Sequence, residues 1–199
     1  MLIYTIENDV MSMSTAEQQK EMQKLSGTIS NYLQADALMQ IAILNKILSN
    51  TVKGTFKIYN YNPDKKLVRN IVEESFKGKH FSERVWDNEK EVAKYMQKQI
   101  DDFIQGKVSV NKIKKNVEDI FNTSAYNAER LVETEISRAH TSAFDRFCEE
   151  VGVKKVRYNA TFCNTCDRCA SEHGRIFEFR NRIELPRHPK CQCYYDIVE

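Results

Sequence analysis

Cysteine and histidine side chains that can bind a metal ion are concentrated in the segment 163–193. This segment holds five of the six cysteines and two of the four histidines. Within it, Cys166 and Cys169 form a C-x-x-C pair, and His188 and Cys191 form an H-x-x-C pair. Two ligands at this spacing can lie on one turn and face the same ion, and the gap between the pairs falls in the range of roughly 15–20 residues expected of a two-pair zinc site. The predicted ligands of a Zn²⁺ ion are four of the following five residues, with Cys163 as a further candidate: Cys166, Cys169, His188, Cys191 and Cys193.

Three alternatives to zinc use the same cysteines. Cys163, Cys166 and Cys169 are spaced like the start of a ferredoxin cluster motif, but His173 stands where the next cysteine would follow. A disulfide, with Cys163 as the expected participant, is disfavoured in a reducing compartment. Buried thiols without a ligand are common in protein cores, but the tight clustering favours zinc over that interpretation. Cys148 stands apart on a helical pattern and is expected to pack in the core.

Four protein ligands make a closed tetrahedral site, which is typical of structural zinc. A catalytic zinc ion would keep one position open for water, and no carboxylate stands at a spacing that argues for this arrangement. We therefore expect zinc to stabilise the fold and the protein not to be an enzyme. The alternative is a metal-dependent hydrolase or nuclease, for which the candidate acid–base groups are Glu135, His140 and His173.

Length and charge restrict the class of protein. The chain has 199 residues and a net charge of +2, which suits one domain, or one domain with an added module, and gives no reason to expect strong nonspecific nucleic-acid binding. It has no run of 18 apolar residues, so no segment is expected to span a membrane. The first residues lack the basic region and long apolar core of a signal peptide, so we expect synthesis in a reducing cytoplasm and no membrane partner.

Helical periodicity covers most of the chain before residue 152. Gly27 is a candidate break in the first helix, and 54–63 has the character of a strand-like connector. The capping and periodicity signals predict helices over about 14–52, 65–76, 82–106, 109–122 and 123–151.

Short strands are predicted from alternating patterns in the C-terminal part of the chain and at its start. The start, Leu2–Ile6, is expected to be a short strand or a docking arm. The three strands predicted in the C-terminal part lie at 155–160, 176–179 and 194–198. A unit of this size is too small to be held by burial alone, which agrees with a metal clip.

The predicted fold class is therefore mainly α, a helical bundle with a small C-terminal zinc-stapled α+β module. The predicted domains are an N-terminal helical arm over 1–60, a helical domain over 61–152 and a zinc-binding, β-rich module over 153–199.

Two polar groups outside the cysteine cluster are singled out by their spacing. Glu135 and Arg138 are three residues apart on the predicted helix 123–151 and can form an ion pair. The predicted structural polar cluster consists of Arg130, Thr134, Glu135 and Arg138. A locally basic stretch is either a solvated face or a DNA contact surface, and it consists of Lys107, Lys112, Lys114 and Lys115.

The order of motifs in the C-terminal part resembles the phage head morphogenesis family, the minor head or minor capsid proteins typified by the phage Mu F-like proteins. The segments that carry the resemblance are Arg130–Arg138, Gly152–Val156, Thr165–Cys169, Gly174–Phe177 and Pro186–Cys193, and 81–86 and 104–109 are also similar. The chain departs from the family pattern at Gln192, where the family has Arg, and at 162–164, where an acidic residue commonly precedes the C-x-x-C.

This resemblance implies a structural protein of phage or prophage head assembly. Such a protein would lie inside the virion head near the portal vertex, after synthesis in the cytoplasm of the bacterial host. Its expected partners are the portal protein, other head proteins and packaged DNA, and the apolar N-terminal helices are the expected surface for the portal or for self-association. The alternative among binding proteins is a stand-alone DNA-binding zinc module, which only the Lys107–Lys115 stretch supports.

Overall fold

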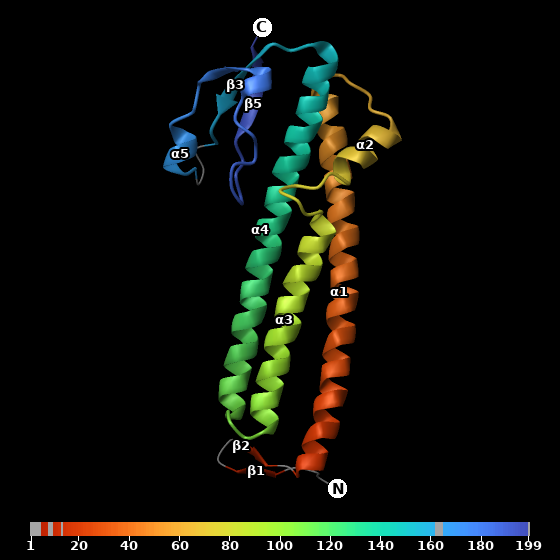
Figure 1. The fold of residues 1–199 in the computed structure, drawn as a ribbon, viewed down its shortest axis with the longest axis vertical. Coiled ribbons are helices and arrows are strands. Elements are labelled where there is room, and N and C mark those ends of the chain that lie inside the picture. Colours follow the sequence, from red (N-terminus) through yellow and green to blue (C-terminus); the bar gives the residue numbers. More distant parts are fainter. Residues whose placement is uncertain (1–4, 8–9, 13, 162–164, 199) are drawn as a thin grey trace. The chain divides into compact units, whose positions relative to one another are not determined.

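The computed structural model describes residues 5–7, 10–12, 14–161 and 165–198. Within these residues the fold is mainly α-helical, with a small antiparallel sheet near the C-terminus, which confirms the predicted fold class (Figure 1). The elements in chain order are β1 Thr5–Glu7, β2 Val10–Ser12, α1 Thr15–Ile58, α2 Lys65–Val72, α3 Phe81–Ile104, α4 Val110–Val151, β3 Lys155–Asn159, α5 Asp167–Ala170, β4 Ile176–Glu178, the 3-10 helix η1 Phe179–Asn181 and β5 Tyr194–Val198.

At the start of the chain, β1 and β2 form a two-stranded antiparallel sheet in which Ile6 lies opposite Met11. The strand predicted at Leu2–Ile6 therefore overlaps β1, whereas its first residues, 2–4, lie outside the described residues.

The chain falls into two compact units, and α1 and α4 each contribute to both. The first unit consists of Met1–Ile41 and Ser82–Ala128, and the second of Ala42–Phe81 and Glu129–Glu199. These units differ in their bounds from the segments 1–60, 61–152 and 153–199, whose separate folding stays a prediction.

The first unit brings the N-terminal part of α1, most of α3 and the beginning of α4 side by side (Figure 1). Polar side chains join these helices. Ser26 of α1 donates to Gln97 of α3 at 2.5 Å. Gln40 of α1 donates to Glu89 of α3 at 3.0 Å, and this Glu89 carboxyl is buried. Burial, opposed by the Gln40 hydrogen bond, raises the pKa of Glu89.

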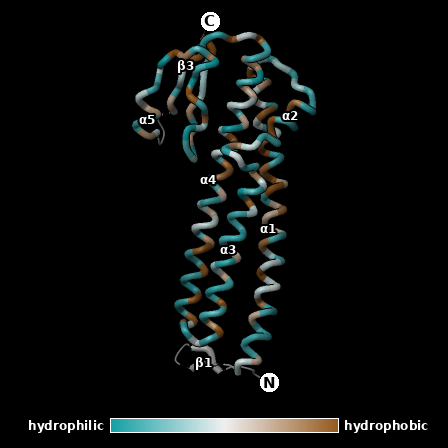
Figure 2. The backbone as a smooth tube through the Cα atoms, viewed as in Figure 1, coloured by the Kyte–Doolittle hydropathy of each residue, from teal (hydrophilic) through white to brown (hydrophobic). Residues whose placement is uncertain are grey.

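The second unit has a more apolar interior. Figure 2 shows that α1 becomes more hydrophobic toward its C-terminal half. There, buried side chains recur every fourth residue and form one stripe, which consists of Leu44, Leu48, Val52 and Phe56. Just past the helix, the Tyr59 ring stacks on Phe147 of α4 with 4.5 Å between centroids. Asp64 caps the N-terminus of α2, where its side chain accepts a hydrogen bond from the Leu67 N–H at 2.6 Å.

Two predicted boundaries of the long helices are wrong. α1 continues through Gly27 and on to Ile58, where a strand-like connector was expected. Alternation would bury both Phe56 and Ile58, but Phe56 is fully buried and Ile58 is 70% exposed. The helical stripe of buried residues therefore determines the conformation of the last turns of α1. Gly27 does not break the helix, because an interior glycine costs only about 1 kcal/mol.

The helices predicted at 109–122 and 123–151 are a single helix, α4. At the predicted boundary, the Thr123 hydroxyl donates back to the Asp119 carbonyl at 2.9 Å. A threonine that bonds to the carbonyl four residues earlier continues a helix instead of starting one. None of the helices in the described residues is long and apolar enough to cross a membrane.

Candidate metal centre

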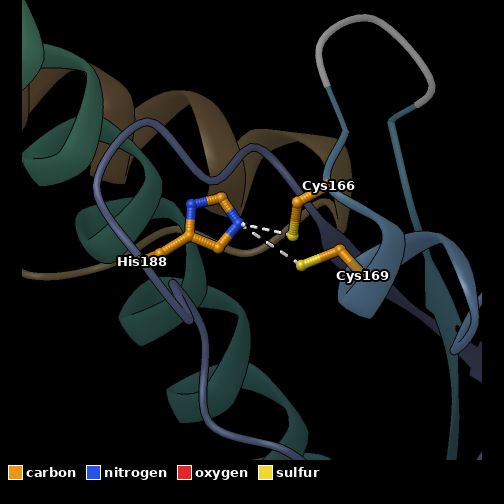
Figure 3. A group of neighbouring side chains, drawn as sticks. All are labelled: Cys166, Cys169 and His188. Carbon is orange, nitrogen blue, oxygen red and sulfur yellow. Dashed lines mark hydrogen bonds between the residues drawn. The ribbon is translucent and has the colours of Figure 1, made fainter.

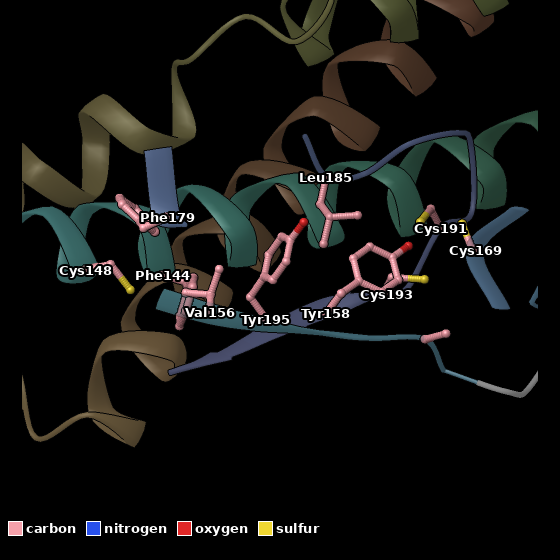
Figure 4. Packing of buried hydrophobic residues seen from close by; sticks show 11 residues of the cluster. Phe144, Cys148, Val156, Tyr158, Cys169, Phe179, Leu185, Cys191, Cys193 and Tyr195 are labelled. Carbon is pink, nitrogen blue, oxygen red and sulfur yellow. The ribbon is translucent and has the colours of Figure 1, made fainter. Parts of the chain in front are cut away.

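The sheet that positions the candidate metal centre has the strand order β4-β3-β5, and all of its pairs are antiparallel. On the central strand β3, Val156 and Tyr158 are buried, and Tyr158 lies opposite Tyr195 of β5. They share one core with Phe144 and Cys148 of α4 (Figure 4). Cys169, Cys191 and Cys193 lie in the same core, whereas Cys166 is exposed, so the candidate metal centre lies at the edge of the hydrophobic interior of the second unit.

Each predicted ligand pair lies on one tight turn. The Cys169 N–H donates to the Cys166 carbonyl at 2.9 Å, at the start of the short helix α5. The Cys191 N–H donates to the His188 carbonyl at 3.1 Å. Each pair thus contains the same type of local hydrogen bond, from the N–H of the second ligand to the carbonyl of the first. This arrangement lets two ligands three residues apart face one ion.

Cys166, Cys169 and His188 converge on one point (Figure 3). His188 Nε2 lies 3.4 Å from the Sγ atom of Cys166 and 3.4 Å from that of Cys169. A tetrahedral ion with Zn–S bonds of about 2.3 Å and Zn–N bonds of about 2.0–2.1 Å would place sulfur and nitrogen about 3.6 Å apart. The observed separations are therefore close to the edges of a zinc tetrahedron.

The orientation of the His188 ring suits metal binding. Its Nδ1 atom lies 2.9 Å from the carbonyl oxygen of Pro189. A carbonyl can only accept a hydrogen bond, so Nδ1 carries the proton and Nε2 presents its lone pair to the two cysteines. Metal-binding histidines are commonly fixed in this way by a carbonyl behind the ring.

A second set of donors consists of Cys169, Cys191 and Cys193, whose sulfur atoms lie within 4.8 Å of one another. All three residues are buried. The two sets share Cys169, and each can hold a metal ion. The five residues predicted as ligands thus fall into two overlapping sets of three that are joined through Cys169.

The described cysteines are all free thiols. The further candidate, Cys163, which is the first position of the ferredoxin-like spacing, lies outside the described residues. The prediction that Cys148 packs in the core agrees with its full burial. Burial, with a smaller contribution from the nearby Asp145, raises the pKa of the Cys148 thiol to about 12.

A loop that carries two candidate ligands is fastened to α4 through Lys190. The Lys190 N–H donates to the Thr134 hydroxyl at 3.0 Å, and its ammonium lies 3.0 Å from Glu129 and 3.9 Å from Glu133. Lys190 has a left-handed backbone with φ of 60°, which turns the chain between His188 and Cys191. Sequence reasoning did not single out Lys190, and no local pattern marks its partners 56 or more residues away.

The four residues of the predicted polar cluster face two different neighbours. Thr134 contacts the loop that carries His188 and Cys191, and its hydroxyl also donates to the Arg130 carbonyl at 2.6 Å. Arg130 itself is exposed. Glu135 and Arg138 form the expected ion pair at 2.7 Å, with both side chains buried. Arg138 continues to the end of α2, where it donates to the Ile71 carbonyl at 2.9 Å.

The lysines predicted as a DNA contact are exposed at the start of α4 and in the loop before it. Lys107 lies 3.9 Å from the carboxylate of Asp102. Because Lys114 follows Lys112 by two residues on a helix, the two side chains project in different directions. The patch is therefore spread around α4, and DNA contact through it stays a prediction.

The groups predicted for acid–base catalysis are not gathered into one site. Glu135 is paired with Arg138, and His173 accepts a hydrogen bond from the Ala160 N–H at 3.2 Å through Nδ1. His140 lines a cavity of about 470 Å³ together with Glu133, Ser137 and Cys193, among others. Burial lowers the pKa of His140. Among the described residues, only the two cysteine sets group three or more donors in a way that can hold a metal ion.

Two further residues at the site were not found from the sequence. Tyr158 of β3 is fully buried, and its pKa is raised by burial and then by the neighbouring Cys169 and Cys193. Arg187 also lies beside the Tyr158 hydroxyl, and it donates to the Arg168 carbonyl at 2.8 Å. This last bond ties the His188 loop to the helix that carries Cys169. A tyrosine on an alternating strand signals burial only, so no sequence pattern marks its place beside the thiols.

No protein-family model, curated protein or solved structure matches this chain.

Proposed function

We propose that this chain is a minor head protein of a phage or prophage, and that a structural zinc ion holds its C-terminal module. The observation that carries the metal part is the convergence of Cys166, Cys169 and His188, with both sulfur–nitrogen separations at 3.4 Å. The head-assembly part is supported by the ordered motifs between Arg130 and Cys193.

The donor chemistry supports zinc over harder cations. Thiolate and imidazole ligands suit zinc, whereas magnesium and calcium prefer oxygen ligands. Three cysteines and one histidine in tetrahedral geometry form a closed site, with no position left for a reacting water. The role proposed for the ion is therefore stability, which can reach on the order of 10 kcal/mol in small zinc modules. The protein is proposed to be a binding and structural component and not an enzyme.

The role in the head follows from what such a module can present. The ion joins α5, which carries Cys169, to the loop that carries His188, and Lys190 joins this loop to α4. A small surface formed by α5 and the His188 loop, and fixed to α4, can serve as a rigid recognition element for the portal protein or for other head proteins. Packaged DNA is a further proposed partner.

The metal part is tested by elemental analysis and thiol counting on the purified protein. One zinc ion per chain, with release of thiols to a chromogenic reagent only after chelation, is the expected result. The double variant C166S/C169S should bind no zinc, and C148S is the matched control because Cys148 is buried away from both ligand sets. A wild-type protein that is fully folded without metal and unaffected by chelators would contradict a structural ion.

The head-assembly part is tested by co-expression with the portal protein of the same phage genome. The wild type should co-purify with the portal, and C166S/C169S should not. In purified heads, the protein should resist added protease until the heads are opened. Absence of the protein from intact heads would contradict this role while leaving the metal result untouched.

A further inference from the structure

We propose that Tyr158 is a positioning residue of the metal centre, whose hydroxyl donates a hydrogen bond to the metal-bound sulfur of Cys169. This inference rests on the proposed metal site and assigns it an outer residue that the ligand motif does not contain. Tyr158 reaches the site from β3, whereas the ligands come from α5 and the segment after η1.

The first observation is a buried hydroxyl whose hydrogen bond is missing. Tyr158 is fully buried, and its hydroxyl makes no hydrogen bond of normal length and angle with the described residues. Leaving a buried hydroxyl unpaired costs about 1–3 kcal/mol. The hydroxyl of the neighbouring Tyr195, by contrast, donates to the Ile183 carbonyl at 2.8 Å. The two tyrosines of this core thus differ in whether the hydroxyl makes a hydrogen bond of normal geometry.

The second observation is the direction of the hydroxyl. Figure 4 shows it pointing toward the end of the core where Cys169, Cys191 and Cys193 lie. The side chains next to it are those of Cys169, Cys193 and Arg187. A guanidinium can only donate hydrogen bonds, so the acceptors available to the tyrosine proton are the sulfurs.

Metal binding would make these sulfurs stronger hydrogen-bond acceptors for the Tyr158 hydroxyl. A thiol is a weak acceptor, but cysteine binds a metal as the thiolate, and hydrogen bonds to ionised acceptors are roughly twice as strong as neutral ones. Cys169 belongs to both ligand sets, so it binds the ion whether Cys191 or Cys193 completes the site. The Tyr158 hydroxyl is thus a hydrogen-bond donor already in place for the negative charge that the Cys169 sulfur carries when the ion is bound.

Arg187 completes the arrangement. Its guanidinium lies beside the same hydroxyl and can donate to the tyrosine oxygen while the tyrosine proton points at sulfur. A chain of donors from Arg187 through Tyr158 to Cys169 would spread the negative charge of the thiolates without adding a ligand.

The test compares Tyr158→Phe with Tyr195→Phe, using Zn²⁺ and Co²⁺ as probes. Tyr158→Phe should lower zinc affinity by about 10–100-fold, as losses of outer-shell partners do. It should also move the sulfur-to-cobalt charge-transfer band to lower energy, because an unbonded thiolate gives up an electron more easily. The metal-free variant should be as stable as the wild type or more stable, since an unpaired buried hydroxyl has been removed.

Tyr195→Phe removes the same atom from the same core at a position that faces Ile183. It should lower stability with and without metal, and leave both the zinc affinity and the cobalt spectrum unchanged. A purely packing role for Tyr158 predicts the same behaviour for both variants.

A Tyr158→Phe protein with wild-type affinity and a wild-type cobalt spectrum would overturn this inference and leave the zinc site standing. A wild-type protein that binds neither ion would overturn both. If Tyr158→Phe does not fold, the wild type loaded with cadmium-113 provides the second measurement. The Tyr158 hydroxyl proton should then exchange slowly and show scalar coupling to the metal, and absence of that coupling would also reject the hydrogen bond.

Discussion

Arg138 donates through Nε to Glu135 Oε2 at 2.7 Å, one turn apart on α4, with both side chains buried. The same guanidinium donates to the Ile71 carbonyl at 2.9 Å and to the Val72 carbonyl at 3.4 Å, where α2 ends. One arginine therefore neutralises a buried carboxylate and satisfies carbonyls at a helix C-terminus, which have no partner within their own helix.

The first prediction concerns this pair. Arg138→Met should lower the free energy of unfolding by about 3–5 kcal/mol, because it removes the arginine that pairs with the buried Glu135 carboxylate. The double variant E135M/R138M should be more stable than Arg138→Met alone, since it removes the buried carboxylate as well. Urea unfolding of the single and double variants measures both values. A double variant as unstable as the sum of its two single variants would show that Glu135 and Arg138 are not coupled.

The second prediction distinguishes the two candidates for the fourth ligand. Cys191 shares a closed turn with His188, as Cys166 does with Cys169, whereas Cys193 lies just before β5. We expect Cys191→Ser to lower zinc affinity by more than the roughly 10–100-fold that outer-shell changes cost, and Cys193→Ser to have the smaller effect. Competition with a chromophoric chelator measures the affinities. The opposite ranking would assign the fourth position to Cys193.

Local patterns predicted those parts of the site that depend on neighbours in the chain. The C-x-x-C and H-x-x-C spacings identified both turns, and Glu135 and Arg138 were expected to pair because three residues separate them on a helix. The partners of Arg138 on α2 lie 66 and 67 residues away in the chain, and no local pattern encodes them.

The same distinction applies to the elements. Helical stripes and caps located most helices, but Thr123 has a side chain that can either cap a helix or bond back within one. Its hydrogen bond to Asp119 shows the second use, so one long helix replaces the two predicted. The alternation of the predicted strand 155–160 carries no information on what lies above it, so the place of Tyr158 beside the thiols could not be predicted.

The third prediction uses the ion pair between Arg182 and Asp145 of α4, whose closest atoms lie 2.5 Å apart. Arg182 also covers the Phe179 ring at 4.0 Å, so it joins the segment after β4 to the helix. Burial raises the pKa of Asp145, while Arg182 opposes this effect. Arg182→Met should therefore lower stability at pH 7 by about 1–3 kcal/mol, since both side chains are only partly buried.

The pH dependence of that loss has a definite sign. An aspartate whose folded-state pKa is raised favours folding most when it is protonated, and this contribution is lost as pH rises above the ordinary value of 3.8 through the folded-state value. Without Arg182 the pKa of Asp145 rises further, so the deficit of Arg182→Met should shrink as pH falls through this raised folded-state value. Thermal unfolding of both proteins across this range measures the difference. A deficit that stays constant with pH would show that Arg182 acts through packing on Phe179.

The fourth prediction concerns His140, which lies on the same helix and lines the cavity beside Cys193. Burial lowers its pKa below 6.5, so the folded protein disfavours the charged ring. The stability that comes from a neutral His140 is complete above pH 6.5 and is lost as pH falls from there through the lowered folded-state pKa. His140→Gln cannot take up this proton, and its melting temperature should therefore fall less than that of the wild type between pH 7 and pH 5. Both curves are measured with excess zinc, so that the difference between them reports the contribution of His140. Parallel curves would mean that the ring of His140 is as accessible to protons in the folded protein as in the unfolded chain.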